Sequence, residues 1–197
     1  MMWSQRLLRV CVVVCVMVIS ACSGGEERMW FEGSLPLEER ETVEHFQHSV
    51  EPALGQFVKR MEAYSAGATL IRDSVLRTSG EAFDLETAGI GFADPVDIEA
   101  ARALGDELFI PLGFDTISVH GEGDDASIWW LNLEHGGYVR LMLLGPRGAS
   151  ISATSSRRPS DGSTVPNSRT RLTAPAWELA LPKGEHYIPS RRDRSLE

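Results

Sequence analysis

Apolar residues recur every three or four positions along residues 36–80. This spacing places apolar side chains on one side of an α-helix, so it predicts helical structure through the stretch. Pro36 suits a first helical turn and Gly80 suits a helix end, whereas Pro52 must kink or divide the segment. We therefore expect two or three helices here. The apolar positions are Val43, Phe46, Val50, Leu54, Phe57, Met61, Tyr64, Ala68, Ile71 and Val75.

A further helix is expected to begin at Asp94. The preceding residues 81–93 show no clear period and predict a loop. Asp94 is a good N-cap, Pro95 fits the first helical position, and Gly105 can end the helix. These signals predict a helix of about ten residues.

Beyond Phe114 the apolar period falls to two, which is the period of a β-strand. Residues 128–133 and 139–144 flank the turn sequence Glu134-His135-Gly136-Gly137, where glycine supplies the positive φ of a tight turn. The pattern predicts a β-hairpin, followed by another strand at residues 149–154.

Two neighbouring tryptophans, Trp129 and Trp130, lie on the first strand of this hairpin, so their side chains point to opposite faces. Both faces of the hairpin are therefore apolar. We expect one indole to pack beneath the helices and the other to be covered by Trp177 and Leu179 or by a partner protein. Trp129 and Trp130 are thus the candidate partner surface, and packing of both within the chain is the alternative.

The order of these patterns predicts an α+β fold, with N-terminal helices on one side of an antiparallel sheet of four or five strands. The predicted domain covers residues 34–154. Residues 155–173 are rich in Ser, Thr, Arg, Pro and Gly, which is typical of a flexible loop or linker. Residues 174–182 are expected to form a final strand, and residues 183–197 a frayed basic tail.

The first residues of the chain have the pattern of a secretory signal peptide. Arg6 and Arg9 precede an apolar run at residues 10–19, and small residues follow. The run is shorter than the roughly 20 apolar residues that span a bilayer. At its end stands Ile19-Ser20-Ala21-Cys22, an aliphatic residue and two small residues before a cysteine.

This tetrapeptide resembles the lipobox of bacterial lipoproteins. The resemblance implies that residues 1–21 are removed, that Cys22 carries a diacylglycerol on its sulfur, and that residues 22–33 form a lipidated tether. Ser23 stands where the family's membrane-retention signal is an Asp, which implies the outer membrane, facing the periplasm, in a host with two membranes. An ordinary secretory signal and an uncleaved N-terminal anchor are the alternatives.

Composition excludes several classes of function. The chain has a formal net charge of −9, with its basic residues concentrated after residue 150. An acidic body argues against nucleic-acid binding, which depends on Lys and Arg. The cysteines are Cys11, Cys15 and Cys22, so the mature domain is expected to lack a disulfide, a thiol nucleophile and a cysteine-bound zinc.

The densest group of potential metal ligands is Glu41, Glu44, His45 and His48, whose spacing brings their side chains together on one helical face. Helical geometry turns this face away from the apolar stripe. We therefore expect a solvated helix surface, with a metal site as the weaker alternative.

A second group of polar residues falls at predicted strand ends and turns, where catalytic groups are often carried. No motif in the chain names a reaction, and polar turns commonly have this composition. We expect a membrane-anchored, non-catalytic interaction or assembly module with an unknown envelope protein as partner and no cofactor. The alternative is a small cell-envelope hydrolase that uses acid/base residues near His120 and Asp124. The group is Asp115, His120, Glu122, Asp124, Asp125, Glu134 and His135.

Overall fold

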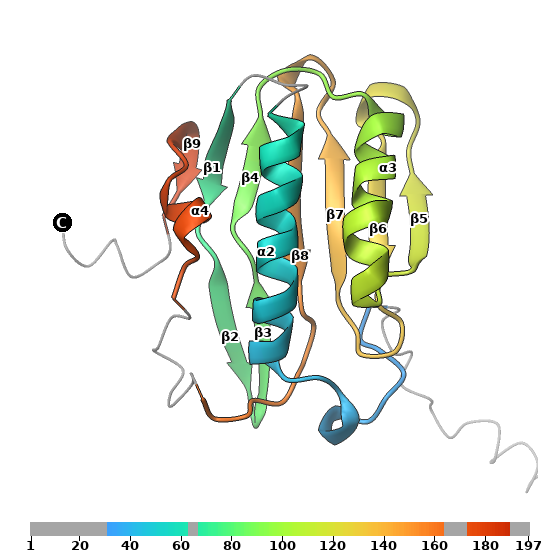
Figure 1. Ribbon diagram of the computed structural model, residues 1–197, viewed down its shortest axis with the longest axis vertical. Coiled ribbons are helices and arrows are strands. Elements are labelled where there is room, and N and C mark those ends of the chain that lie inside the picture. Colours follow the sequence, from blue (N-terminus) through green and yellow to red (C-terminus); the bar gives the residue numbers. More distant parts are fainter. Residues whose placement is uncertain (1–30, 63–66, 164–172, 190–197) are drawn as a thin grey trace, which may run out of the picture.

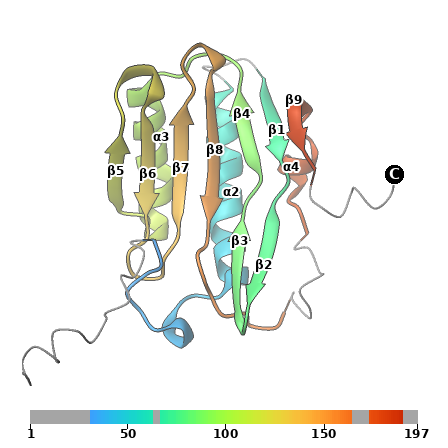
Figure 2. The same ribbon diagram turned by 180° about the vertical axis from the view of Figure 1, so that it is seen from behind.

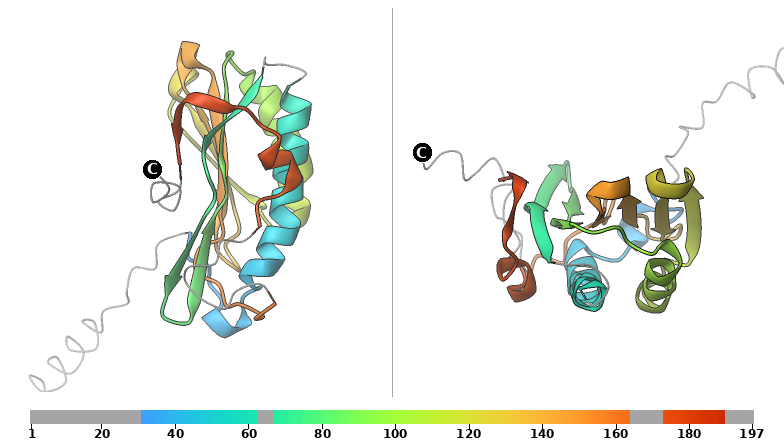
Figure 3. Two further views of the ribbon diagram at one scale, coloured as in Figure 1. Left: turned by 90° about the vertical axis from the view of Figure 1, so that its left-hand side faces the viewer. Right: turned by 90° about the horizontal axis from the view of Figure 1, so that it is seen from above.

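The computed structural model describes residues 31–62, 67–163 and 173–189, so the predicted signal peptide and the lipobox Ile19-Ser20-Ala21-Cys22 lie outside the described residues. The fold is α+β. In the described part, three α-helices lie on one face of a nine-stranded sheet and leave the other face without a helix (Figures 1 to 3). The predicted α+β class is confirmed, but the expected count of four or five strands was too low. The expected order, helices first and strands after them, is wrong, because β1 to β4 lie between α2 and α3 and because α4 follows β8 in the chain.

Most of the sheet is antiparallel. Its strand order is β5-β6-β7-β8-β4-β1-β9, with β3 joined to β8 and β2 joined to β3, and only β1 and β9 are parallel to each other. The helices are α2 (Val43–Met61), α3 (Ile98–Phe109) and α4 (Ala176–Leu179). The strands are β1 (Ala68–Arg72), β2 (Val75–Ser79), β3 (Ala82–Glu86), β4 (Gly89–Phe92), β5 (Thr116–His120), β6 (Ser127–Leu131), β7 (Tyr138–Leu143), β8 (Ala149–Thr154) and β9 (Lys183–Ile188).

The helical prediction for residues 36–80 holds only for its first half. α2 is continuous, with Pro52 inside it, and Thr42 caps it by accepting a hydrogen bond from the backbone N–H of His45 at 3.1 Å. Residues 68–79 instead form β1 and β2. A register shift between Leu70 and Arg72 explains the misleading spacing, because it breaks the alternation by which a strand is recognised.

The predicted loop at residues 81–93 is also wrong, since it contains β3 and β4. Ile90 and Phe92 are buried against the helices. Gly91 leaves room for a neighbour on the other face, because a Cβ there would lie 2.9 Å from Cδ1 of Ile71. Glycine in a strand thus marks a close approach here rather than a loop.

The helix predicted after Asp94 is present with shifted ends. Asp97 caps α3 by accepting from the backbone N–H groups of Glu99 and Ala100. Gly105 lies inside the helix rather than at its end. A side chain there would overlap the ring of Trp130, so the glycine lets α3 approach the sheet closely.

The two neighbouring tryptophans lie on opposite faces, as expected. Trp130 is fully buried beneath α3, where Nε1 donates to Oδ1 of Asp106 at 2.7 Å. Trp129 is half-buried, and strand alternation directs its side chain to the face without helices. The expected cover by Trp177 and Leu179 is wrong, because Trp177 packs against Gly55 of α2 and Leu179 is 72% exposed.

The C-terminal predictions are reversed by the structure. Residues 174–182, expected to form a strand, contain the helix α4, and residues 183–188, expected to fray, form β9 beside β1. Residues 190–197 of the predicted tail lie outside the described residues. No described helix has both the length and the apolar character needed to cross a membrane.

Candidate functional site

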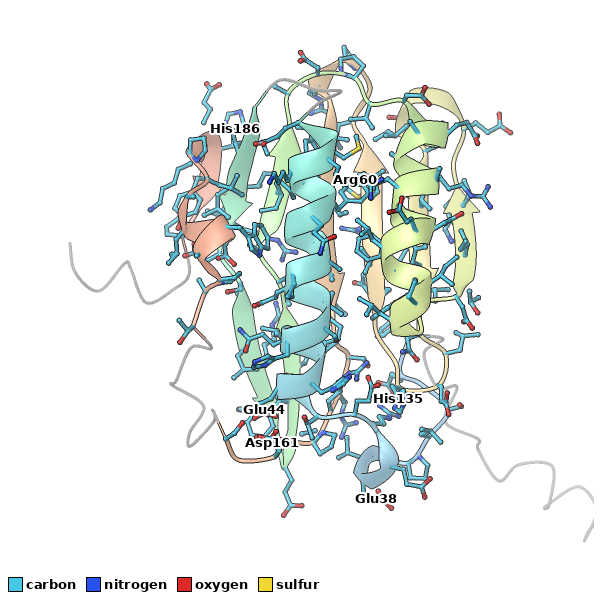
Figure 4. All side chains as sticks on the ribbon, viewed as in Figure 1. Glu38, Glu44, Arg60, His135, Asp161 and His186 are labelled. Atoms are coloured by element: carbon cyan, nitrogen blue, oxygen red, sulfur yellow. The ribbon has the colours of Figure 1, made fainter. Side chains whose placement is uncertain are left out.

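A cleft of about 700 Å³ opens at the end of the sheet where the chain enters α2. Its volume falls within the roughly 300–1,000 Å³ typical of small-molecule sites. The start of α2, the segment before β5 and the turn between β6 and β7 form its walls, and His135 lies beside the lower end of α2 in Figure 4. The titratable residues in the lining are Glu41, His45, Asp115, Glu134 and His135.

The β6–β7 turn presents two of these side chains. Oδ1 of Asn132 accepts hydrogen bonds from the backbone N–H groups of Glu134 at 3.2 Å and His135 at 2.8 Å. This side-chain capping fixes the turn. Gly136 follows with a φ of +81°, and a Cβ there would lie 2.7 Å from the carbonyl oxygen of Glu32. The predicted hairpin and its glycine turn are therefore confirmed.

Glu41 is the centre of the polar wall. Its Oε1 lies 3.5 Å from Nε2 of His45 and 3.9 Å from Nε2 of His135, and its Oε2 lies 2.9 Å from Nη1 of Arg158. The backbone N–H of Glu41 donates to Nδ1 of His135 at 3.1 Å. A neutral His135 accepting at Nδ1 carries its proton on Nε2, on the side of the Glu41 carboxylate.

Arg158 supports this wall from inside the protein, although residues 155–173 were predicted to be a flexible linker. Its side chain is 1% exposed. Besides Glu41, it donates to the carbonyl oxygens of Ser155 at 3.0 Å and Gly136 at 2.9 Å, and it lies over the ring of Phe46. The linker prediction is wrong for residues 155–163, which pack on the domain; residues 164–172 lie outside the described residues.

Burial lowers the pKa of Arg158, while the hydrogen bond and the charge of Glu41 raise it. Arginine stays protonated across the physiological range. Its guanidinium is buried, whereas the Glu41 side chain that it contacts is 34% exposed. The Oε2 atom of Glu41 is therefore occupied by its hydrogen bond from Arg158. Asp115 and Glu134 are the remaining carboxylates of the lining, which contains no Lys or Arg among the described residues. The cleft consequently favours neutral or cationic groups over anionic ones.

The fold divides the potential metal ligands at the start of α2: Glu41 and His45 stay together, with Oε1 and Nε2 3.5 Å apart, whereas Glu44 turns into the protein. Glu44 was expected on a solvated face but is 3% exposed, because it accepts hydrogen bonds from the hydroxyl of Ser160 and from the backbone N–H of Asp161 at 3.1 Å (Figure 4). Glu41 pairs with Arg158, and His45 and His48 are exposed. Within the described ranges, no group of three His, Cys, Asp or Glu residues is placed to hold a metal ion.

The second group of predicted residues is also divided. Asp115, Glu134 and His135 line the cleft, whereas His120 lies at the far end of β5, about 15 Å along the strand. There its Nε2 lies 2.9 Å from Oγ of Ser118, and its ring meets Trp129 edge-on. Glu122 and Asp125 flank the turn beyond β5, and the side chain of Asp124 lies outside what the structure describes.

Sequence reasoning placed Arg158 in a solvated basic segment and did not single out Asn132. Arg158 lies 117 positions from Glu41, so no local pattern joins them. Asn132 carried a usable signal, because an Asn two residues before a Glu and four before a Gly is typical of a side-chain-capped turn.

No family model matches this chain, and no curated protein matches it. A solved structure has a similar fold: the crystal structure of a DUF4853 family protein from Actinomyces odontolyticus. The two chains share 17% sequence identity with a TM-score of 0.55, over 74% of this chain and 82% of that chain. This likeness extends to the fold alone.

Proposed function

We propose that this protein is a bacterial lipoprotein, anchored through a lipid on Cys22, which acts at the membrane as a non-catalytic interaction module. In a host with two membranes, the proposed location is the outer membrane, facing the periplasm. The proposal rests on the lipobox for the anchor and on the position of the cleft for the interaction.

The cleft lies at the end of the domain nearest the proposed anchor in the sequence. Ser34 and Leu35 line it, and the backbone N–H of Ser34 donates to the carbonyl oxygen of Leu133 in the opposite wall at 2.8 Å. Ser34 follows Cys22 by twelve residues. A fully extended tether of that length spans at most about 40 Å. A lipid on Cys22 would therefore keep the cleft close to the membrane surface, where it could meet a partner.

The polar groups of the cleft favour binding over catalysis. The Glu41 carboxylate is neutralised by Arg158, and the hydroxyl of Ser49 donates to the backbone carbonyl of His45 at 2.9 Å rather than to a base. His120, which the hydrolase alternative requires, lies on an exposed strand end away from the cleft. A nucleophile held against a general base is the arrangement that catalysis would need. The described lining of the cleft holds no such pair, and the contact between Ser118 and His120 lies outside that lining.

Photocrosslinking in living cells tests the interaction. A photoreactive amino acid replaces Leu133, which is 43% exposed at the cleft, or Leu179, which is 72% exposed on α4. We expect a discrete protein adduct in the membrane fraction from position 133 and none from position 179. Equal adducts from both positions, or none from position 133, would contradict an interaction through the cleft.

A further inference from the structure

Strand β5 forms one edge of the sheet (Figure 2), and Asp115, which immediately precedes it, lines the cleft. It pairs with β6 in an unbroken antiparallel register, from Thr116 opposite Leu131 to His120 opposite Ser127. In the described part of the chain, no strand pairs with its outer edge. An edge of this kind presents a row of backbone donors and acceptors that another chain can pair with.

The backbone groups at this edge can be identified from the neighbouring pair of strands. Asn132 donates to the carbonyl oxygen of Gly137, and Leu143 donates to that of Ala126, so the even-numbered residues of β6 direct their backbone groups toward β7. Hydrogen-bonded and non-hydrogen-bonded pairs alternate in an antiparallel ladder. The odd-numbered residues of β6 therefore direct their backbone groups toward β5, and Trp129 exchanges backbone hydrogen bonds with Ser118.

The residues beside Ser118 consequently face outward. The N–H and C=O groups of Ile117 and Val119 point away from β6, and no backbone or side-chain hydrogen bond within the described ranges engages them. The Val119 side chain is 49% exposed. Two adjacent pairs of open backbone groups are therefore available to an added strand.

The other edge strands are protected. β9 contains Lys183 and lies between Pro182 and Pro189. β2 carries Arg77, which forms an ion pair with Glu86 across the ladder. Lysine, proline and charged side chains are the usual means by which an edge resists pairing. The five residues of β5 include no Lys, Arg or Pro and no bulge, so β5 is the edge left open to a partner.

Charge at the ends of β5 selects the partner. Asp115 precedes the strand and lines the cleft, and Glu122 follows it; residues 113–126 contain no Lys or Arg. Self-pairing of two antiparallel copies about Ser118 would place Asp115 of one copy opposite Gly121 of the other, one position from Glu122. Acidic residues would then gather at both ends of the paired strands, and this like charge opposes a dimer. Basic residues of a partner segment, placed at the two ends of β5, would instead be attracted to Asp115 and Glu122.

We infer that the outer edge of β5 accepts an extended segment of a partner protein as an additional strand, with basic residues flanking the paired core. The inference rests on the proposed function as an interaction module and names the kind of partner. Backbone bonds to Ile117 and Val119 hold the segment, and Asp115 and Glu122 fix its ends. Asp115 makes the edge continuous with the cleft.

The test uses the full-length protein purified in detergent and two peptide display libraries. Each library has five randomised positions, flanked on both sides by two lysines or by two glutamates. We expect selected peptides from the lysine library only, and slower hydrogen exchange at the amides of Ile117 and Val119 when they bind.

Two variants separate backbone pairing from side-chain contact. Val119→Pro removes an outward N–H without removing a bond to β6, and should weaken peptide binding by about tenfold or more. Val119→Thr keeps the N–H and should leave binding within about twofold of the wild type. Circular dichroism checks that both variants fold. If Val119→Pro does not fold, a peptide N-methylated at its central residues replaces it.

Three results would overturn the inference: no enrichment from the lysine library, equal enrichment from both libraries, or protection of Ile117 and Val119 by self-association without peptide. None of these results bears on lipidation of Cys22, so a failure of strand addition is distinguishable from a failure of the proposed anchor.

Discussion

At the residue scale, Arg158 joins three parts of the chain that are distant in sequence. It is buried, and it contacts Glu41 before α2, Gly136 in the β6–β7 turn and Ser155 after β8. A charge without its partner in such a place is far more costly than the pair itself. The shape of the cleft therefore depends on a residue that does not line it.

Arg158→Met should lower the free energy of unfolding by about 2–4 kcal/mol, because it leaves the carbonyl oxygens of Ser155 and Gly136 without their donor and removes the cation beside Glu41. Urea denaturation measures the loss. Arg157→Met is the matched control, since Arg157 is exposed, and should change stability by less than about 0.5 kcal/mol. Equal losses in the two variants would show that Arg158 does not hold the cleft.

At the element scale, hairpin β6–β7 and helix α3 could be predicted because their signals are local: alternating residues around a glycine turn, and a capping aspartate before a helical period. β1 to β4 could not. The buried apolar residues of β1, β3 and β4 share one core with those of α2, and the register shift between Leu70 and Arg72 gives β1 a helix-like spacing. α4 and β9 are placed by packing on α2 and by pairing with β1, which local sequence does not encode.

The two tryptophans of β6 should differ in their effect on stability. Trp130→Ala removes a fully buried indole beneath α3 and should cost about 3–5 kcal/mol. Trp129 is half-buried on the other face, where its ring centroid lies 4.7 Å from that of Tyr138 and 5.0 Å from Cζ of Arg140. Trp129→Ala should therefore lower the free energy of unfolding by less, about 1–2 kcal/mol. Thermal or urea unfolding measures both. Equal losses would mean that the face without helices is covered as completely as the core.

The contact between α2 and α4 should depend on pH. Burial raises the pKa of Glu51 to about 7, a hydrogen bond from Gln47 lowers it, and the charge of Glu178 raises it. The pKa of Glu51 in the folded protein lies above the ordinary value of 4.5 that it has in the unfolded chain. The contribution of protonated Glu51 to the free energy of unfolding is therefore fully present below pH 4.5 and is lost as the pH rises through 7.

We therefore expect the free energy of unfolding to fall between pH 4.5 and 7, by at most about 3 kcal/mol from this group. Glu51→Gln removes the titration and should flatten that part of the curve, whereas Glu39→Gln, at an exposed position, should not. Denaturation at a series of pH values measures the slopes. An unchanged slope in Glu51→Gln would contradict the assignment.

At the scale of the whole molecule, the sheet separates two surfaces. Helices cover one face (Figure 3). The cleft and the open edge of β5 meet at Asp115, and Ser34 and Leu35 line the same cleft. Asp115, Glu134 and His135 could be named from sequence because they fall at turns, but their meeting with Glu41 and His45 depends on pairing across the sheet. The proposed lipid on Cys22 would hold the cleft and the β5 edge near a membrane.

Intact-mass spectrometry of the protein from the membrane fraction tests the anchor most directly. The account predicts a mature chain that begins at Cys22 and carries the added mass of a diacylglycerol. For Cys22→Ala it predicts a chain that keeps its leader and gains no lipid mass. Cys15→Ala, a change within the leader, should give the wild-type mass. A wild-type protein that begins at another residue, or that begins at Cys22 without lipid, would contradict the account.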